Sequence, residues 1–209
     1  MDKFKTIDKN YTEQIIEKKS KFIANVFYIN NVQEAEEILK TIKKKYYDAK
    51  HNCFAYIVVD ESGNIIQKSS DDKEPSGTAG GPILNIINGM NLCNVIVIVT
   101  RYFGGILLGT GGLVRAYSEA TTKVLNSANI IELELGTLIK VEVEYSNIEN
   151  LKYYCRKNNI KIAKENYSNN VEIFLEITKD KWKKMELDKM KLKITKIDKI
   201  HEKYIKIDL

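Results

Sequence analysis

The sequence is poor in the residue types on which disulfide frameworks, metal sites and membrane spans depend. It has three widely spaced cysteines without a CxxC pair, and only two histidines. This set predicts neither a structural zinc site nor a disulfide framework, so we expect buried, inert thiols. No run approaches the roughly 18 apolar residues of a membrane helix. The N-terminus has no apolar signal segment. We therefore expect a cytoplasmic protein without a membrane partner.

Arginine is also scarce, with three arginines among 33 basic residues. The net charge of +5 is unevenly spread: residues 1–134 hold 16 basic and 16 acidic residues, and residues 135–209 hold 17 and 12. A basic module favours an acidic partner such as RNA. An AT-rich genome would also enrich lysine, so the charge leaves both interpretations open.

Length and pattern predict an α+β protein of two domains. A chain of 209 residues is long enough for two domains. Its content of 44% hydrophobic and 29% charged residues is typical of a globular protein. The apolar run 94–100 predicts a central strand. We expect strand 130–135 to close the first domain and strand 138–145 to open the second, whose element order βαββαβ is the ferredoxin-like plan. The predicted domains are 1–135 and 136–209.

Several helix ends carry capping signals. Asn30 or Asn31 is positioned to cap the first helix. Ser146–Glu149 has the S-x-x-E form of a capping box. Asp180 is positioned to cap the helix predicted over Lys181–Met190.

Eight of the eleven glycines lie in two loops, 69–82 and 101–117. Such a concentration implies positive φ angles or a close backbone approach. Both loops run into predicted helix N-termini, which favour anions, and arginine suits phosphate or carboxylate. We therefore predict an anion or nucleic-acid site formed by Arg101, Gly104, Gly105, Gly109, Gly111, Gly112 and Arg115. Alternatively, the glycines allow tight helix-on-sheet packing, and Asp72 and Glu74 pair with the arginines.

The sequence gives less support to nucleotide binding, to Cys–His catalysis and to cation binding. No glycine-rich stretch carries the Lys-Ser/Thr of a P-loop, and 109–114 has valine where a dinucleotide fingerprint has its third glycine. His51 and Cys53 could share a strand face, but the pair lacks an orienting group. The acids of 71–74 could bind a hard cation, though a salt-bridged loop is the stronger interpretation. We expect no catalytic residue, no metal and no cofactor.

Four segments in this order resemble the YigZ/IMPACT family. They are Lys19–Phe22, His51–Tyr56, Asp71–Gly80 and Thr100–Tyr117. Around the first glycine-rich loop, the residues that match the family motif are His51, Asp72, Glu74, Gly77, Thr78 and Gly80. The resemblance covers about the first 130 residues, and the second domain resembles bacterial members in position and strand order only.

The resemblance implies a first domain similar to elongation factor G domain four and the ribonuclease P protein, a ribosomal-protein-like β-α-β fold. The second domain would be similar to the last, ferredoxin-like domain of elongation factor G. The family is related to a eukaryotic regulator of translation, and no enzymatic activity is implied.

The leading hypothesis is therefore a non-enzymatic, translation-associated regulatory protein. It would bind RNA or the ribosome through the glycine-rich anion site and the basic second domain. Two alternatives stay open: an enzyme acting on a phosphorylated small molecule, and a protein–protein interaction module.

Overall fold

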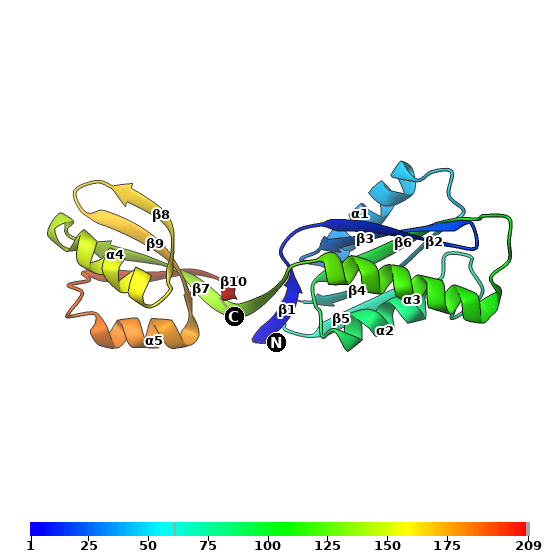
Figure 1. Ribbon diagram of the computed structural model, residues 1–209. Coiled ribbons are helices and arrows are strands. Elements are labelled where there is room, and N and C mark those ends of the chain that lie inside the picture. Colours follow the sequence, from blue (N-terminus) through cyan, green and yellow to red (C-terminus); the bar gives the residue numbers. More distant parts are fainter. Residues whose placement is uncertain (61, 208–209) are drawn as a thin grey trace. The chain divides into compact units, whose positions relative to one another are not determined.

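The computed structural model describes residues 1–60 and 62–207. They form two compact units: Met1 with the described residues of 3–132, and Asp2 with residues 133–207. Each unit combines helices with a β-sheet (Figure 1), which confirms the predicted α+β class. No helix among the described residues is long and apolar enough to cross a membrane.

The first unit is built on an antiparallel sheet of five strands. In spatial order they are β2 (Tyr11–Glu17), β3 (Ser20–Tyr28), β6 (Val95–Tyr102), β4 (His51–Val59) and β5 (Ile65–Ser70). The short strand β1 (Lys3–Ile7) precedes them in the chain. The apolar run predicted as a central strand is β6, which is buried over seven of its eight residues, so that prediction is confirmed.

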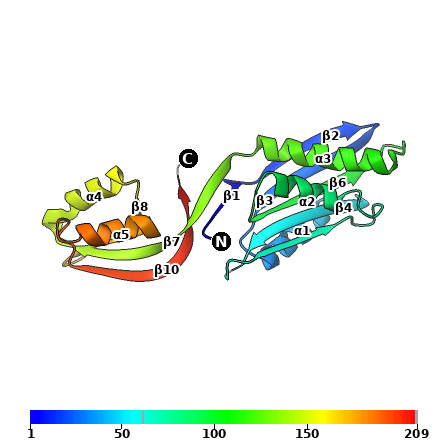
Figure 2. The ribbon, with the colours of Figure 1, turned by 90° about the horizontal axis from the view of Figure 1, so that it is seen from below.

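Helices cover both faces of this sheet. Helices α2 (Gly80–Gly89) and α3 (Gly109–Ser127) lie on one face and α1 (Val32–Lys45) on the other (Figure 2). Asn31 caps α1, as predicted, by accepting a hydrogen bond from the Glu34 N–H at 2.8 Å. The core beneath α1 includes Ala35, Ile42, Phe54, Tyr56 and Ile96. Because both faces of the sheet are covered, the central strands have almost continuously apolar sequences.

The strand register brings three loops to one end of the sheet. Lys21 pairs with Tyr102 and His51 pairs with Arg101, while β5 ends at Ser70. The β2–β3 turn, the β5–α2 loop and the β6–α3 loop therefore converge, and both glycine-rich segments lie at this end.

The second unit has the element order βαββαβ. Its elements are β7 (Ile130–Val143), α4 (Ile148–Lys157), β8 (Lys161–Tyr167), β9 (Val171–Thr178), α5 (Lys179–Asp188) and β10 (Lys196–Ile207). The strands lie in the order β10–β7–β9–β8. This 4-1-3-2 arrangement is the ferredoxin-like plan, so the prediction for the second domain is confirmed.

The sheet of the second unit has one buried and one polar face. Alternate residues of β9 are buried, and Ile173 and Leu175 pack with Leu151 of α4 and Met185 of α5. On the polar face, charged side chains pair across strands. These pairs include Lys140–Glu172 at 2.9 Å, Lys161–Glu176 at 3.1 Å and Lys203–Glu176 at 2.6 Å.

The prediction of two separate strands around Gly136 is wrong, because β7 runs without interruption from Ile130 to Val143. Gly136 lies inside the strand, where a Cβ atom would stand 2.6 Å from the carbonyl oxygen of Ile177 and would overlap the Ile205 side chain. Glycine therefore allows a close approach between strands here and does not interrupt the strand.

Two capping predictions in the second unit are also wrong. The residues Tyr145–Asn147 form a 3₁₀ turn, and α4 begins at Ile148 without a capping hydrogen bond from the Asn147 side chain. Helix α5 begins at Lys179, two residues before the expected start at Lys181, so Asp180 lies in its first turn. There the carboxylate still complements the helix dipole, although it does not cap the helix.

Candidate functional site

A buried ion pair joins the two glycine-rich segments. Nη1 of Arg101, near the end of β6, lies 2.7 Å from Oε1 of Glu74 in the β5–α2 loop, and the two side chains are 8% and 3% exposed. The hydroxyl of Tyr117 on α3 donates to the same oxygen at 2.9 Å. A buried charge pair needs such additional hydrogen bonds. The alternative in which an acid of the first loop pairs with an arginine therefore describes Arg101.

Arg115 differs from Arg101 both in its exposure to solvent and in its lack of an ion pair. It lies on the exposed surface of α3 and forms no ion pair with any described residue. Arg101 is 7% exposed, and its Nε atom is buried without a hydrogen-bond partner in the described part of the chain. Of the two predicted anion-binding arginines, Arg115 is the one whose guanidinium reaches solvent.

His51 and Cys53 both contact the β5–α2 loop, so they share a strand face as expected. The Nδ1 atom of His51 donates to the carbonyl oxygen of Asp72 at 3.0 Å. The Sγ atom of Cys53 donates to the carbonyl oxygen of Asp71 at 3.0 Å. The Asp72 carboxylate accepts the N–H of Asn52 at 2.7 Å. These bonds fix the loop to β4.

The thiol of Cys53 is protonated at neutral pH. Burial, with a smaller contribution from the nearby carboxylates, raises its pKa to about 12. Burial likewise raises the pKa of Tyr117, whose hydroxyl lies 3.3 Å from Sγ. Since the thiolate is the nucleophilic form, this environment does not activate Cys53. No group of three His, Cys, Asp or Glu residues within the described chain could hold a metal ion.

The N-terminus of α2, one of the two expected anion positions, holds a carboxylate of the chain itself. Asp71 accepts the N–H groups of Gly77 and Ala79 at 2.9 Å and that of Gly80 at 2.8 Å. Burial acts to raise the pKa of Asp71, but these three N–H bonds outweigh it and hold the pKa below its ordinary value. An external anion would have to displace this carboxylate.

The remaining residues of the first loop set its backbone path. Gly77 has φ 75°, which glycine adopts without strain. Thr78 donates from Oγ1 to the Pro75 carbonyl at 2.6 Å. A Cβ atom on Gly80 would stand 2.7 Å from the Ser70 backbone. These positions therefore have structural reasons for their residue types.

The second loop leaves side chains exposed. Gly104 lies against the backbone of Lys19, where a Cβ atom would overlap the carbonyl group, while Gly105 and Gly109 have φ of 85° and 69°. Gly111 and Gly112 lie inside α3. The exposed apolar residues of this segment are Phe103, Ile106, Leu107 and Val114.

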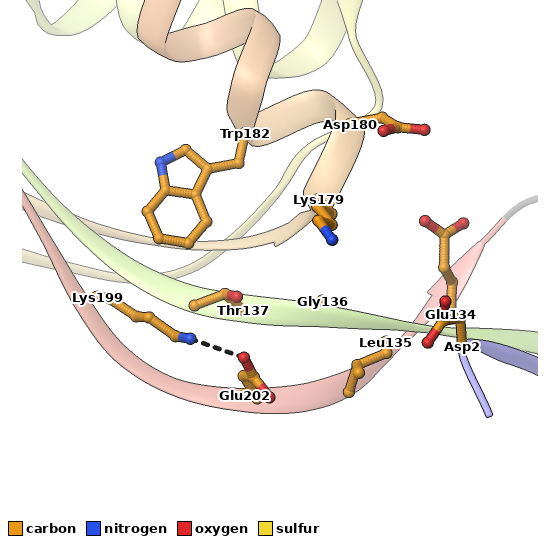
Figure 3. A pocket seen from close by; sticks show the side chains of 10 residues that line it. All are labelled: Asp2, Glu134, Leu135, Gly136, Thr137, Lys179, Asp180, Trp182, Lys199 and Glu202. Atoms are coloured by element: carbon orange, nitrogen blue, oxygen red, sulfur yellow. Dashed lines mark hydrogen bonds and ion pairs between the residues drawn. The ribbon is translucent and has the colours of Figure 1, made fainter. Parts of the chain in front are cut away.

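The second unit contains a pocket of ≈ 380 Å³ that the sequence did not indicate (Figure 3). Its lining includes Trp182 and four acids, Asp2, Glu134, Asp180 and Glu202. Only two lysines line it, and one of them, Lys199, pairs with Glu202 at 2.7 Å. With more acids than lysines, this pocket does not suit a phosphate.

Fold and site together define a two-domain α+β protein whose first domain holds two glycine-rich loops around a buried Glu–Arg pair. Residues 18–125 match the family model described as the Impact N-terminal domain, and residues 141–185 match a domain of unknown function, DUF1949. The chain belongs to the IMPACT family.

Individual relatives cover most of the chain. IMPACT family member YvyE of Bacillus subtilis is 36% identical over 80% of this chain and 76% of its own length. IMPACT family member YigZ of Escherichia coli is 31% identical over 72% of this chain and 74% of its own. The crystal structure of a hypothetical protein shares 26% identity, covers 96% of this chain and 98% of its own, and has a TM-score of 0.65.

The roles of two members of the site were not predicted from the sequence. Tyr117 shares the carboxylate of Glu74 although 43 residues separate them, and Asp71 occupies the start of a helix nine residues further on. Neither spacing is a local motif. The one available signal was that both residues lie in the segments that resemble the family.

Proposed function

We propose that this chain is a non-enzymatic regulatory protein of translation that binds RNA or the ribosome. Its membership of the IMPACT family supports the regulatory role, because the resemblance connects these segments to a eukaryotic regulator of translation. The protonated Cys53 and the internally bonded acids support a binding role over catalysis.

The observation that carries the proposal is a charge imbalance at the end of the sheet where the loops converge. There the carboxylates of Asp71, Asp72 and Glu74 are all bonded within the chain. Lys43 reaches this end and pairs with Asp72 at 2.9 Å, whereas Lys18, Lys19, Lys21, Lys73 and Arg115 form no ion pair with a described acid. Unpaired cations release counterions when they meet phosphate, which favours a nucleic-acid partner.

The second unit adds long-range attraction. Lys140, Lys161 and Lys203 on its sheet face are paired with acids. Others, such as Lys157, Lys183 and Lys193, are exposed and form no pair with a described acid. Because these positive charges are free, the unit should steer a polyanion to the protein without recognising its sequence.

A protein partner is the second candidate. Ile106 and Leu107 are 43% and 83% exposed beside the unpaired cations. Exposed apolar side chains of this kind also occur in protein–protein interfaces.

Fluorescence anisotropy with a labelled single-stranded RNA, repeated over a range of salt concentrations, tests the proposal. We expect measurable affinity that falls as salt rises, with a slope that reports the number of phosphates contacted. Deleting residues 136–209 should flatten that slope. The absence of binding at every salt concentration would favour the protein partner.

A further inference from the structure

We infer that the first unit holds single-stranded nucleic acid, with one base stacked on the ring of Phe103. We call the surface formed by Phe103, the β2–β3 turn and the start of α3 the tip. The inference rests on the proposed function and deepens it, because it specifies the form of nucleic acid and the residue that grips it.

Phe103 is an exposed aromatic residue in a fixed position. It directly follows β6 and is 55% exposed. The guanidinium carbon of Arg101 stands over its ring, 5.7 Å from the centroid, and Arg101 is itself held by Glu74. Because the Arg101 guanidinium covers one face of the Phe103 ring, we infer that a base stacks on the opposite face. Base–aromatic stacking of this type holds single strands in many proteins.

Two lysines lie in the turn that contacts the loop of Phe103. The N–H of Gly104 donates to Oγ of Ser20 at 3.2 Å, which places the ring beside the β2–β3 turn. Lys18 and Lys19 form that turn with φ of 43° and 65°, and both are exposed. The start of α3 lies at the same end of the unit in Figures 1 and 2, and Arg115 lies in the second turn of that helix.

The chemistry of the tip favours a single strand over a duplex or an apolar protein. In a duplex the bases are stacked inside the helix, so a ring such as Phe103 would have to unstack a base step to engage it, whereas the bases of a single strand are already accessible. An apolar protein surface would bury Lys18, Lys19 and Arg115 without partners, which is unfavourable. A single strand satisfies both features, since its phosphates meet the cations while a base meets the ring.

The test compares two ten-nucleotide fluorescent probes, oligoadenylate and an abasic oligomer of equal length. Phe103→Leu should weaken oligoadenylate binding about tenfold and leave abasic binding nearly unchanged, because only stacking is removed. Phe103→Trp should retain or raise the affinity for oligoadenylate. Tyr153→Leu, at an aromatic residue of α4 in the second unit that is 59% exposed, is the matched control and should change neither affinity.

Equal losses for both probes, or no loss for oligoadenylate, would overturn the inference. If oligoadenylate binding is unchanged in Phe103→Leu but remains sensitive to salt, the proposed function survives and only the stacking role fails. If the unsubstituted protein binds neither probe and does not travel with ribosomes, both proposals fail. Thermal unfolding of each variant shows whether any loss of binding reflects loss of the fold.

Discussion

Nη1 of Arg101 and Oε1 of Glu74 lie 2.7 Å apart, and this pair fixes one glycine-rich loop against the other. Glu74 comes from the loop after β5, whereas Arg101 lies near the end of β6 and leads into the second loop. Tyr117 of α3 completes the link through its hydroxyl. The loop end of the first unit is therefore held together by bonds between the two loops and α3.

Glu74→Gln should strongly destabilise the first unit. The substitution leaves the buried Arg101 guanidinium without a counter-charge, and breaking a buried pair from one side typically lowers the free energy of unfolding by roughly 3–5 kcal/mol. Urea unfolding measures the effect. The matched control is Arg115→Gln, at an exposed arginine without an ion pair to a described acid, which should change stability by less than about 0.5 kcal/mol. Equal small effects would show that the pair does not stabilise the fold.

All three thiols should resist alkylation in the native protein. Burial raises the pKa of Cys53 to about 12 and that of Cys155 to about 11, and it also raises the pKa of Cys93. At pH 8 the thiols therefore remain protonated, and iodoacetamide followed by mass spectrometry should show labelling only after denaturation. Rapid native labelling of Cys53 would contradict this environment and reopen a catalytic role.

The same shifts give stability a definite dependence on alkaline pH. A raised pKa favours the protonated thiol in the folded state, so this contribution is complete below the unfolded value of 9.0. It is lost as pH rises from there towards about 12. In Cys53→Ala, the free energy of unfolding should fall less steeply above pH 9 than in the unsubstituted protein. Parallel slopes would place the source of the pH dependence elsewhere.

Gly104→Ala and Gly111→Ala should have opposite effects on stability. A Cβ atom on Gly104 would overlap the Lys19 backbone, whereas one on Gly111 would meet nothing within 4 Å. The first substitution should lower stability by about 1–3 kcal/mol. The second lies in a helix and should raise stability by about 0.5–1 kcal/mol. Thermal unfolding compares them, and a neutral Gly104→Ala would show that the two loops separate readily.

Residues 1–135 and 136–209 should each fold when expressed alone. The core of the second unit lies within residues 139–194, and pairing of β7 with β9 begins at the Gly136–Thr178 pair. Dispersed amide spectra from both fragments would support a boundary at Gly136. A fragment that is unfolded in isolation would show that the two predicted domains do not fold independently.

Periodicity and turn chemistry predicted the elements well but not their ends or their long-range partners. The central strand β6 and the order βαββαβ followed from local patterns, and so did the cap at Asn31. The strand break at Gly136 was wrong because a glycine needed for close packing gives the same local signal as one in a turn. The capping box at Ser146 failed because a 3₁₀ turn precedes the helix.

At the site, the sequence indicated the right loops but could not assign their charges. Only the folded structure shows that Glu74 meets Arg101 and that Arg115 is exposed. In the same way, no local spacing predicts that Asp71 occupies the helix start at Gly80. Such contacts are set by the tertiary fold, which a single sequence does not display.

Sedimentation of the protein with ribosomes on a sucrose gradient tests the central claim most directly. We expect the unsubstituted protein to travel with ribosomal fractions at low salt and to leave them as salt rises. A variant with Lys18→Gln, Lys19→Gln and Arg115→Gln should shift towards the top of the gradient. The control with Lys40→Gln and Lys44→Gln, at exposed lysines of α1, should behave as the unsubstituted protein does. A protein that stays at the top of the gradient at every salt concentration would contradict the account.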